Sequence, residues 1–174
     1  MTSAVLGVGN VLLSDEGIGV RVVDTLGRDY TWPQGLELLD GGTTGMELLE
    51  PLEGLDCLII ADAVRVGQEP GSVAVLRGDQ VPAFFRTKLS PHQIGLSDVL
   101  ATLALTGQYP GQVVVVGLQP VSLATGMELT PAAQAALPLM VRTVVEELAA
   151  HGITPLSGPA PGAVNGACHL EGAV

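Results

Sequence analysis

The sequence predicts an α/β protein, a three-layer α/β/α sandwich built on a twisted, mostly parallel sheet of about five strands. Apolar segments of strand length alternate along the chain with segments whose apolar residues recur at helical spacing. The chain is 47% hydrophobic but only 3% aromatic, so its core must consist mainly of Val, Leu, Ile and Ala, which fill buried parallel strands and their covering helices. A length of 174 residues suits a single domain.

The N-terminal part of the chain predicts two strand and helix pairs. The first strand is expected at 4–9, a short apolar run that ends in glycine, and the first helix at 16–28. A second strand is expected at 35–40, where two glycines follow it. A helix is expected at 45–55, and Pro51 should kink or shorten it.

The middle of the chain contains the strongest strand signal, an apolar run at 56–63 typical of a strand buried on both faces. The segment 71–76 follows a Pro-Gly turn and alternates valine with smaller residues, which favours an edge strand, the candidate for an antiparallel one. The segment 81–90 is expected to be irregular. A helix is predicted at 93–106, where apolar residues recur at near-helical intervals.

A last β-branched strand is predicted at 112–118 and a long helix at 131–151, with Thr130 as its N-cap. We therefore assign 1–153 to one α/β domain. The remaining segment, 154–174, is rich in proline and glycine, a composition typical of a flexible tail.

Charge and hydropathy exclude several classes of protein. The net charge is −11, with 7 Lys and Arg against 18 Asp and Glu, so the surface should repel a phosphate backbone and nucleic acid is not expected as a partner. No apolar stretch reaches the roughly 18 residues of a membrane span, and no basic leader opens the chain. We expect a cytoplasmic protein with no membrane association and, from the lack of an association motif, a monomer. The two cysteines predict no structural disulfide.

The loop at 7–19 places two carboxylates, Asp15 and Glu16, side by side between the first strand and the first helix. It does not fit a dinucleotide-binding glycine pattern, because Leu12 occupies the third glycine position and the acid pair would repel a pyrophosphate. The structural alternative is that Ser14 or Asp15 caps the helix and Glu16 complements its positive end. The loop alone leaves both interpretations open.

Two further polar residues are expected at the same edge of the sheet. Asp62 ends the strongest strand, where α/β proteins place functional groups, although a single aspartate there can also cap a turn. His92 lies just ahead of the helix predicted at 93–106, and a lone loop histidine is commonly a surface residue. Together with Glu16, these side chains could converge. Two carboxylates and one imidazole suit a borderline divalent metal such as Ni²⁺ or Zn²⁺, with coordination positions left for substrate or water.

The fourth candidate is the loop Asp40-Gly41-Gly42-Thr43-Thr44-Gly45. Its glycines allow backbone N–H groups to approach a peptide or a carboxylate closely. The structural alternative is a turn in which a threonine caps the next helix. We take four residues as candidate substrate-binding residues, with the carboxylate as a candidate catalytic group: Asp40, Gly41, Gly42 and Thr43.

The ordered set of motifs resembles the [NiFe]-hydrogenase maturation endopeptidases over about 5–148. The matching motifs are Gly7-x-Gly9-Asn10 with Asp15-Glu16-Gly17-x-Gly19, Asp40-Gly41-Gly42-Thr43-x-Gly45, Asp62-Ala63 and Ser90-x-His92. The resemblance implies a hydrolase, an aspartic-type endopeptidase that removes the C-terminal extension of a hydrogenase large-subunit precursor.

By this resemblance, Glu16, Asp62 and His92 would engage nickel that is already inserted in the precursor, so the metal arrives with the substrate and no organic cofactor is needed. Glu16 and Asp62 are also candidate catalytic groups. Asp40 would lie near the scissile region, in positioning or in proton transfer. The nickel could assist hydrolysis, or it could serve for recognition only while carboxylates act as the general base.

Two other functions remain as alternatives. A non-catalytic nickel-checking or assembly factor for the large subunit would keep the same three ligands, and a nucleotide-binding α/β protein is a more distant third. The tail adds a separate hypothesis, in which Cys168 and His169 offer metal ligands or imitate the metal-binding end of the substrate. The plain alternative is an unstructured extension.

Overall fold

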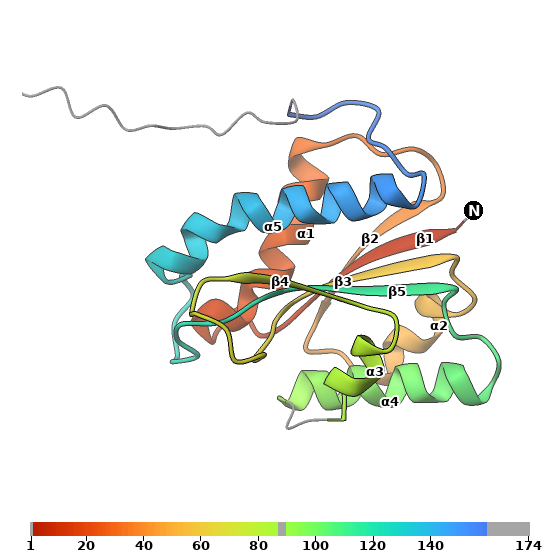
Figure 1. Ribbon diagram of the computed structural model, residues 1–174, viewed down its shortest axis with the longest axis horizontal. Helices are drawn as coiled ribbons and strands as arrows, with labels where there is room; N and C mark the ends of the chain where they lie inside the picture. Colours follow the sequence, from red (N-terminus) through yellow and green to blue (C-terminus); the bar gives the residue numbers. More distant parts are fainter. Residues whose placement is uncertain (1, 87–89, 160–174) are drawn as a thin grey trace, which may run out of the picture.

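A five-stranded sheet forms the centre of the protein in a computed structural model that describes residues 2–86 and 90–159 (Figure 1). The strands are β1 (Ser3–Val8), β2 (Leu36–Gly42), β3 (Cys57–Ala63), β4 (Val73–Arg77) and β5 (Gln112–Leu118). Their order across the sheet is β2-β1-β3-β5-β4, and only β4 is paired antiparallel, to β5. The predicted fold class is confirmed, including an antiparallel strand at the edge.

Helices cover both faces of the sheet and complete the three layers (Figure 1). On one face lie α1 (Ile18–Asp29) and α5 (Pro131–Ala150). On the other face lie α2 (Leu49–Leu52), α3 (Gln80–Phe84) and α4 (Pro91–Leu105). No helix among the described residues is long and apolar enough to cross a membrane.

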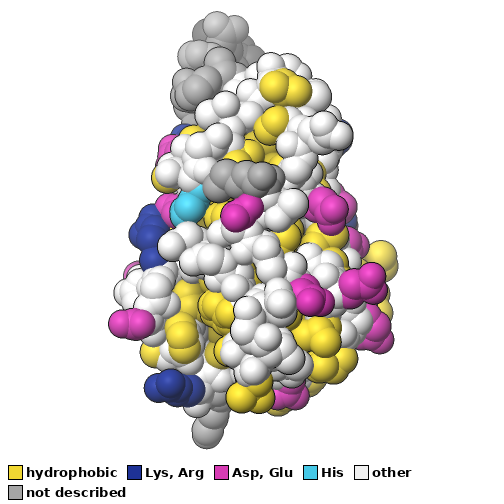
Figure 2. Space-filling view, turned by 90° about the vertical axis from the view of Figure 1, so that its right-hand side faces the viewer, with side chains coloured by type: hydrophobic (Ala, Val, Ile, Leu, Met, Phe, Trp, Pro, Cys, Tyr) yellow, Lys and Arg dark blue, Asp and Glu magenta, His cyan; other side chains and the backbone are white. Residues whose placement is uncertain are grey.

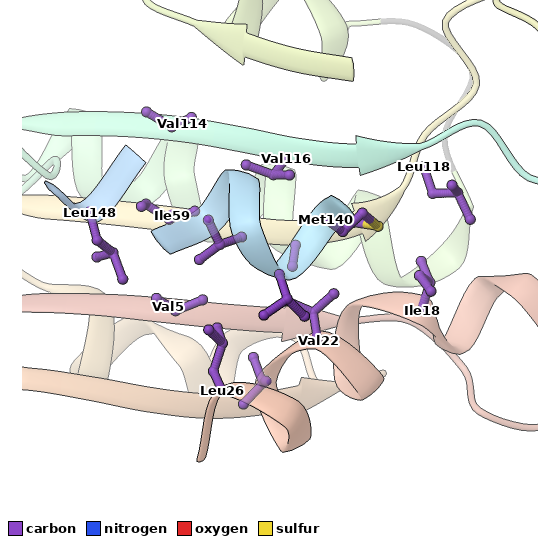
Figure 3. Packing of buried hydrophobic residues seen from close by; sticks show 14 of the residues in the cluster. Val5, Ile18, Val22, Leu26, Ile59, Val114, Val116, Leu118, Met140 and Leu148 are labelled. Carbon is purple, nitrogen blue, oxygen red and sulfur yellow. The ribbon is translucent and has the colours of Figure 1, made fainter. Parts of the chain in front are cut away.

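The core between the sheet and the helices α1 and α5 consists of aliphatic side chains, as the composition predicts (Figure 3). Val5 and Ile59 point from β1 and β3 toward Val22 and Leu26 of α1 and Leu148 of α5. All five are fully buried. Burying such a side chain stabilises the fold by roughly 1.5–3 kcal/mol, so this layer fixes how α1 sits on the sheet.

The first turn of α1 lies directly on the sheet because its second residue is a glycine. A Cβ atom on Gly19 would come within 2.1 Å of the Ala61 carbonyl oxygen and 2.4 Å of the Val8 carbonyl oxygen. Gly9 has φ 124°, and a Cβ atom there would lie 1.8 Å from the Glu16 carbonyl oxygen. The glycines at both ends of the first loop therefore allow the backbone around Glu16 to lie against the ends of β1 and β3.

The helix predicted at 45–55 is wrong in length. The structure has a 3-10 turn, Met46–Leu48, followed by the four-residue helix α2. Pro51 lies inside α2, and the backbone is already extended at Glu53, two residues later. A proline limits a helix because it cannot donate a backbone hydrogen bond, which agrees with the predicted shortening.

The boundaries around α4 also differ from the prediction. The helix begins at Pro91, two residues earlier than predicted, because Ser90 and Gln93 form a capping box. The segment predicted to be irregular, 81–90, contains most of α3, in which Pro82 lies in the first turn, where a helix tolerates proline. At the N-terminal end, α1 is preceded by a 3-10 turn, Ser14–Gly17.

The described start of the tail is attached to the domain. Thr31 N donates to Ser157 O, and Leu156 N donates to Thr31 O. Residues 160–174, which contain Cys168 and His169, lie outside the described residues, so the proposed metal-binding role of that pair stays a prediction.

The edge where the parallel strands begin faces the viewer in Figure 2 and carries separate acidic side chains among hydrophobic ones.

Candidate active site

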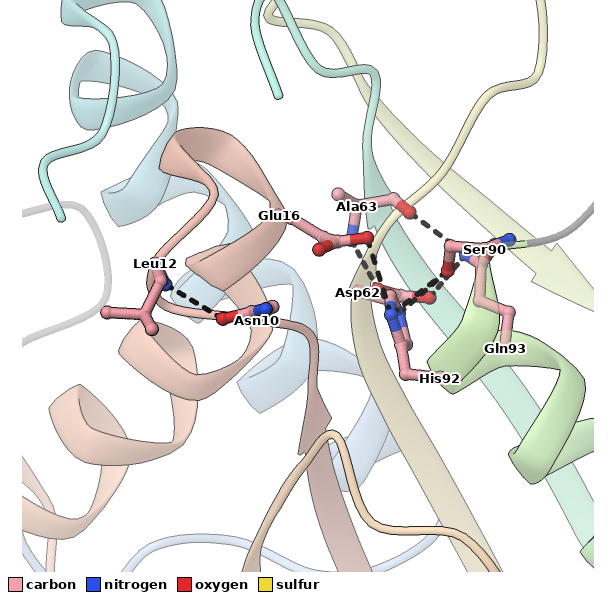
Figure 4. A network of polar contacts seen from close by, with 8 residues as sticks. All are labelled: Asn10, Leu12, Glu16, Asp62, Ala63, Ser90, His92 and Gln93. Carbon is pink, nitrogen blue, oxygen red and sulfur yellow. Dashed lines mark hydrogen bonds and ion pairs between the residues drawn. The ribbon is translucent and has the colours of Figure 1, made fainter. Parts of the chain in front are cut away.

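Glu16, Asp62 and His92 meet at the carboxyl edge of the parallel strands (Figure 4). Glu16 lies in the 3-10 turn before α1, Asp62 lies near the end of β3, and His92 lies in the first turn of α4. The distance from His92 Nε2 to Asp62 Oδ1 is 3.1 Å, and that from His92 Nδ1 to Glu16 Oε1 is 3.4 Å. The structure brings together the three side chains that the sequence predicted to converge, although His92 lies inside the helix and not in a loop.

All three side chains are recessed below the surface, with exposed fractions of 6% for Glu16, 1% for Asp62 and 5% for His92. A carboxylate buried to this degree must be hydrogen-bonded or paired, because desolvation of an isolated charge costs several kcal/mol. The pairing with His92 meets this requirement. A group that binds these side chains would therefore have to reach below the surface at this edge of the sheet.

Gln93 fixes the orientation of the Asp62 carboxylate. Its Nε2 donates to Asp62 Oδ2 at 2.6 Å and to Ala63 O at 3.1 Å, while its Oε1 accepts from Ser90 N. The other oxygen, Asp62 Oδ1, accepts from Ala63 N and faces His92. Gln93 was not among the residues predicted from the sequence, although the Ser-x-x-Gln spacing of a capping box is a signal that points to it.

Asp15 has a structural role that differs from the predicted cap. Neither the 3-10 turn nor α1 has a side-chain cap, so the proposal that Ser14 or Asp15 caps the helix is wrong. The buried Asp15 carboxylate instead accepts from the backbone N of Val121, Ser122 and Thr130 and from the Thr130 hydroxyl. It therefore holds the segment after β5 against the loop that carries Glu16.

Asp40 lies at the end of β2 and is exposed, with Oδ1 accepting from Gly42 N at 2.9 Å. The 3-10 turn that follows the loop has Gly45 as its N-cap and no side-chain cap, so a threonine does not cap it, contrary to the structural alternative. Thr43 is exposed, and Gly41 is buried. Within 2–86 and 90–159, no hydrogen bond or ion pair joins Asp40 to the three recessed side chains.

The loop nevertheless packs beside the helix that carries His92. A Cβ atom on Gly95, one turn along α4, would lie 3.2 Å from Gly45 Cα. This is closer than nearly all real contacts of a Cβ atom, so position 95 favours glycine, whereas a Cβ atom on Gly45 would lie 3.9 Å from Gly95 Cα, an ordinary contact. The glycine loop is thereby held at the same edge of the sheet as the recessed site.

The folded site raises the pKa of both Asp62 and His92. Burial raises the pKa of Asp62, and hydrogen bonds from His92, Gln93 and Ala63 only partly oppose this. For His92, burial lowers the pKa, but the hydrogen bond and charge of Asp62 and the charge of Glu16 outweigh burial, and the net pKa is raised. The imidazole therefore keeps its proton to a higher pH than a free histidine does.

The donor set of two carboxylates and one imidazole fits a borderline divalent metal. Among the described residues, no group of three or more His, Cys, Asp and Glu side chains is already arranged as a metal site. His92 instead makes hydrogen-bond or ion-pair contacts with the two carboxylates. A metal would compete with the proton of His92 for these carboxylates, so binding should release protons.

The metal-free protein is expected to lose stability as the pH rises from about 6 to 8. The folded state raises the pKa of His92 and of Asp62, so it binds more protons than the unfolded state, and the free energy of unfolding must fall as the pH rises. The contribution of His92 is complete below its ordinary pKa of 6.5 and is lost through the raised pKa. Thermal denaturation should show a fall of about 2–4 °C in Tm, or roughly 1 kcal/mol.

The matched variants for this measurement are His92→Gln and His151→Gln. His92→Gln should make Tm less dependent on pH. His151→Gln should leave this dependence unchanged, because His151 lies at the far end of α5, where its Nδ1 contacts Glu147 O. A wild-type Tm that stays level or rises over this range would contradict the proton linkage.

Comparison with known proteins identifies one family. A family model described as hydrogenase maturation protease matches residues 20–147. The hydrogenase 2 maturation protease of Escherichia coli (strain K12) is 47% identical over 154 residues, covering 88% of this chain and 94% of that protein. The hydrogenase expression/formation protein HoxM of Azotobacter vinelandii is 42% identical over 151 residues, covering 86% and 73%.

A solved structure gives the same result. The hydrogenase maturating endopeptidase HybD from E. coli matches with a TM-score of 0.86 and 46% identity, covering 89% of this chain and 96% of that one. Sequence and fold therefore agree over nearly the same part of the chain. The chain belongs to the hydrogenase maturation protease family, whose members are hydrolases that act in hydrogenase maturation.

Proposed function

We propose that this protein is an endopeptidase that removes the C-terminal extension of a [NiFe]-hydrogenase large-subunit precursor after nickel insertion. The observation that carries the proposal is the convergence of Glu16, Asp62 and His92 at the carboxyl edge of the sheet. The nickel belongs to the precursor and enters the site as part of the substrate, and no organic cofactor takes part. We propose that the protein acts as a monomer in the cytoplasm.

The three recessed side chains supply donors for nickel that the precursor presents. Both oxygens of Asp62 already accept hydrogen bonds, which hold the carboxylate in one orientation, as a metal ligand requires. Nickel held there would bring the adjoining peptide of the precursor to the carboxyl edge of the sheet. Its recognition would restrict cleavage to precursors that have received their metal.

Asp40 is the candidate general base. It is exposed at the same edge, and one of its oxygens accepts from Gly42 N, which fixes the orientation of the carboxylate. In the proposed reaction, Asp40 takes a proton from the attacking water as the new C–O bond forms at the scissile carbonyl. The C–N bond then breaks, and Asp40 gives the proton to the leaving amine.

Intact-mass analysis of purified precursor, with and without inserted nickel, tests the proposal. After incubation with this protein, the mass of the nickel-loaded precursor should fall by the mass of the released peptide less one water, which hydrolysis adds across the cut bond, and the nickel-free precursor should stay intact. Cleavage of both forms would remove nickel recognition from the proposal.

The same measurement separates the protease from a non-catalytic nickel-checking factor. A stable complex with the nickel-loaded precursor and no change in its mass would favour that factor. A sample of the precursor alone, kept under the same conditions, controls for cleavage without this protein.

A further inference from the structure

Large hydrophobic side chains stand exposed around the recessed site. Five of them, which we call the apolar rim, are exposed by half or more: Leu12 52%, Met46 51%, Ile94 52%, Val121 50% and Met127 66%. Single exposed hydrophobic residues are common and need no explanation. Several that stand at the edge of the sheet where the polar site lies are typical of a surface that binds another protein.

One side of the apolar rim comes from the loops after β1 and β5, which are joined by backbone hydrogen bonds. Gly126 N donates to Leu12 O at 2.9 Å, which places Met127 beside Leu12. Leu12 N donates to Asn10 Oδ1, as Figure 4 shows. Val121 N donates to the buried carboxylate of Asp15. This side is therefore held in place before any partner binds.

The other side of the apolar rim comes from the glycine loop and α4. Met46 follows Gly45 and Ile94 precedes Gly95, and the close approach of the two glycines brings the two apolar residues to one place. Helix α4 covers the face of the sheet opposite α1 and α5. One side of the rim thus comes from the loops after β1 and β5, and the other side comes from the turn after the glycine loop and from α4.

The recessed site lies between these sides. Leu12 lies four residues before Glu16, and Ile94 lies two residues after His92. Because the three polar side chains are at most 6% exposed, we expect a nickel-bearing segment to enter between the two sides of the rim. Such a segment would lie against the apolar rim.

We infer that the apolar rim binds the precursor through apolar side chains that flank its nickel-bearing segment. This inference rests on the proposed function for the identity of the partner. The rim residues themselves are uncharged, so their contribution to binding should depend less on salt than that of surface ion pairs. A second copy of this chain on the rim would cover the recessed site and exclude the precursor.

Serine substitutions on each side of the rim test the inference, with Leu12→Ser and Met127→Ser on one side and Ile94→Ser on the other. The matched control is Leu105→Ser, because Leu105 is 89% exposed at the last residue of α4, about 20 Å along the helix from His92. All four positions are exposed, so folding, checked by Tm, should be preserved.

Each rim variant is expected to weaken binding of the nickel-loaded precursor about tenfold, since a buried aliphatic side chain contributes roughly that factor. KM should rise by the same factor while kcat changes little, and Leu105→Ser should match wild type. Binding is measured at low and high salt, and the oligomeric state by size-exclusion chromatography. Rim variants that bind like the control would overturn the inference, as would a wild-type dimer that the rim variants dissociate.

The outcomes for the rim and for the proposed function are distinguishable. If binding depends on the rim but wild type does not cleave the precursor, the rim binds the precursor and the protein is not an endopeptidase for it. If every rim variant cleaves the precursor with unchanged KM, the protein is an endopeptidase and the rim does not bind the precursor.

Discussion

Replacing any one of the three recessed side chains should reduce cleavage of the nickel-loaded precursor by roughly 10²-fold, because nickel held by only two of them would present the scissile peptide out of position. Glu16→Gln and Asp62→Asn keep the size of the side chain and remove its charge. His92→Ala removes the nitrogen donor and leaves two buried carboxylates without their partner. The rate of mass loss of the precursor measures the effect.

The control for charge is Glu53→Gln, because Glu53 is exposed and follows α2, before β3 begins at the opposite edge of the sheet. It should cleave at the wild-type rate. Undiminished cleavage by all three site variants would show that the recessed site does not act in the reaction. Thermal denaturation of each variant distinguishes loss of chemistry from loss of folding.

Gly19→Ala should be among the most destabilising single substitutions in the chain. The new methyl group would lie 2.1 Å from Ala61 O and 2.4 Å from Val8 O, and both are backbone atoms that cannot move aside without shifting a central strand. We expect a loss of more than about 4 kcal/mol, enough to unfold many domains of this size. Soluble yield and chemical denaturation measure it.

A second glycine of the same helix provides the matched control. In Gly27→Ala, the nearest heavy atom to the new Cβ is Leu38 Cδ1 at 3.6 Å, an ordinary contact. Alanine also favours a helix over glycine by up to about 1 kcal/mol, so this variant should be as stable as wild type or more so. Equal stability of the two variants would show that the close packing of α1 on the sheet does not matter.

Much of the fold could be predicted because its signals are local. The apolar runs of β3 and β5 have the length and composition of buried strands, and the Pro-Gly turn before β4 marks the edge of the sheet. The short helices α2 and α3 could not be predicted with correct ends. Each spans about one turn, and packing against the sheet decides its ends more than propensity does.

The meeting of Glu16, Asp62 and His92 followed from one topological rule, that the carboxyl ends of parallel strands lie at a common edge. The roles of Asp15 and Gln93 did not follow from it. Asp15 bonds to residues 106 to 115 positions away, and Gln93 bonds to a strand 31 positions away. A single sequence gives no measure of such pairings, so their hydrogen bonds became visible only in the folded chain.

The hydrogen bonds that Asp15 accepts from Val121 and Thr130 also impose an order on the folding of the chain during its synthesis. The loop that carries Glu16 leaves the ribosome long before these two partners do, so the Asp15 carboxylate lacks these hydrogen-bond donors during most of synthesis. The loop can adopt its final form only after β5 has joined the sheet and the segment behind it has emerged. Competence to process another protein is thus acquired late, when the chain itself is almost complete.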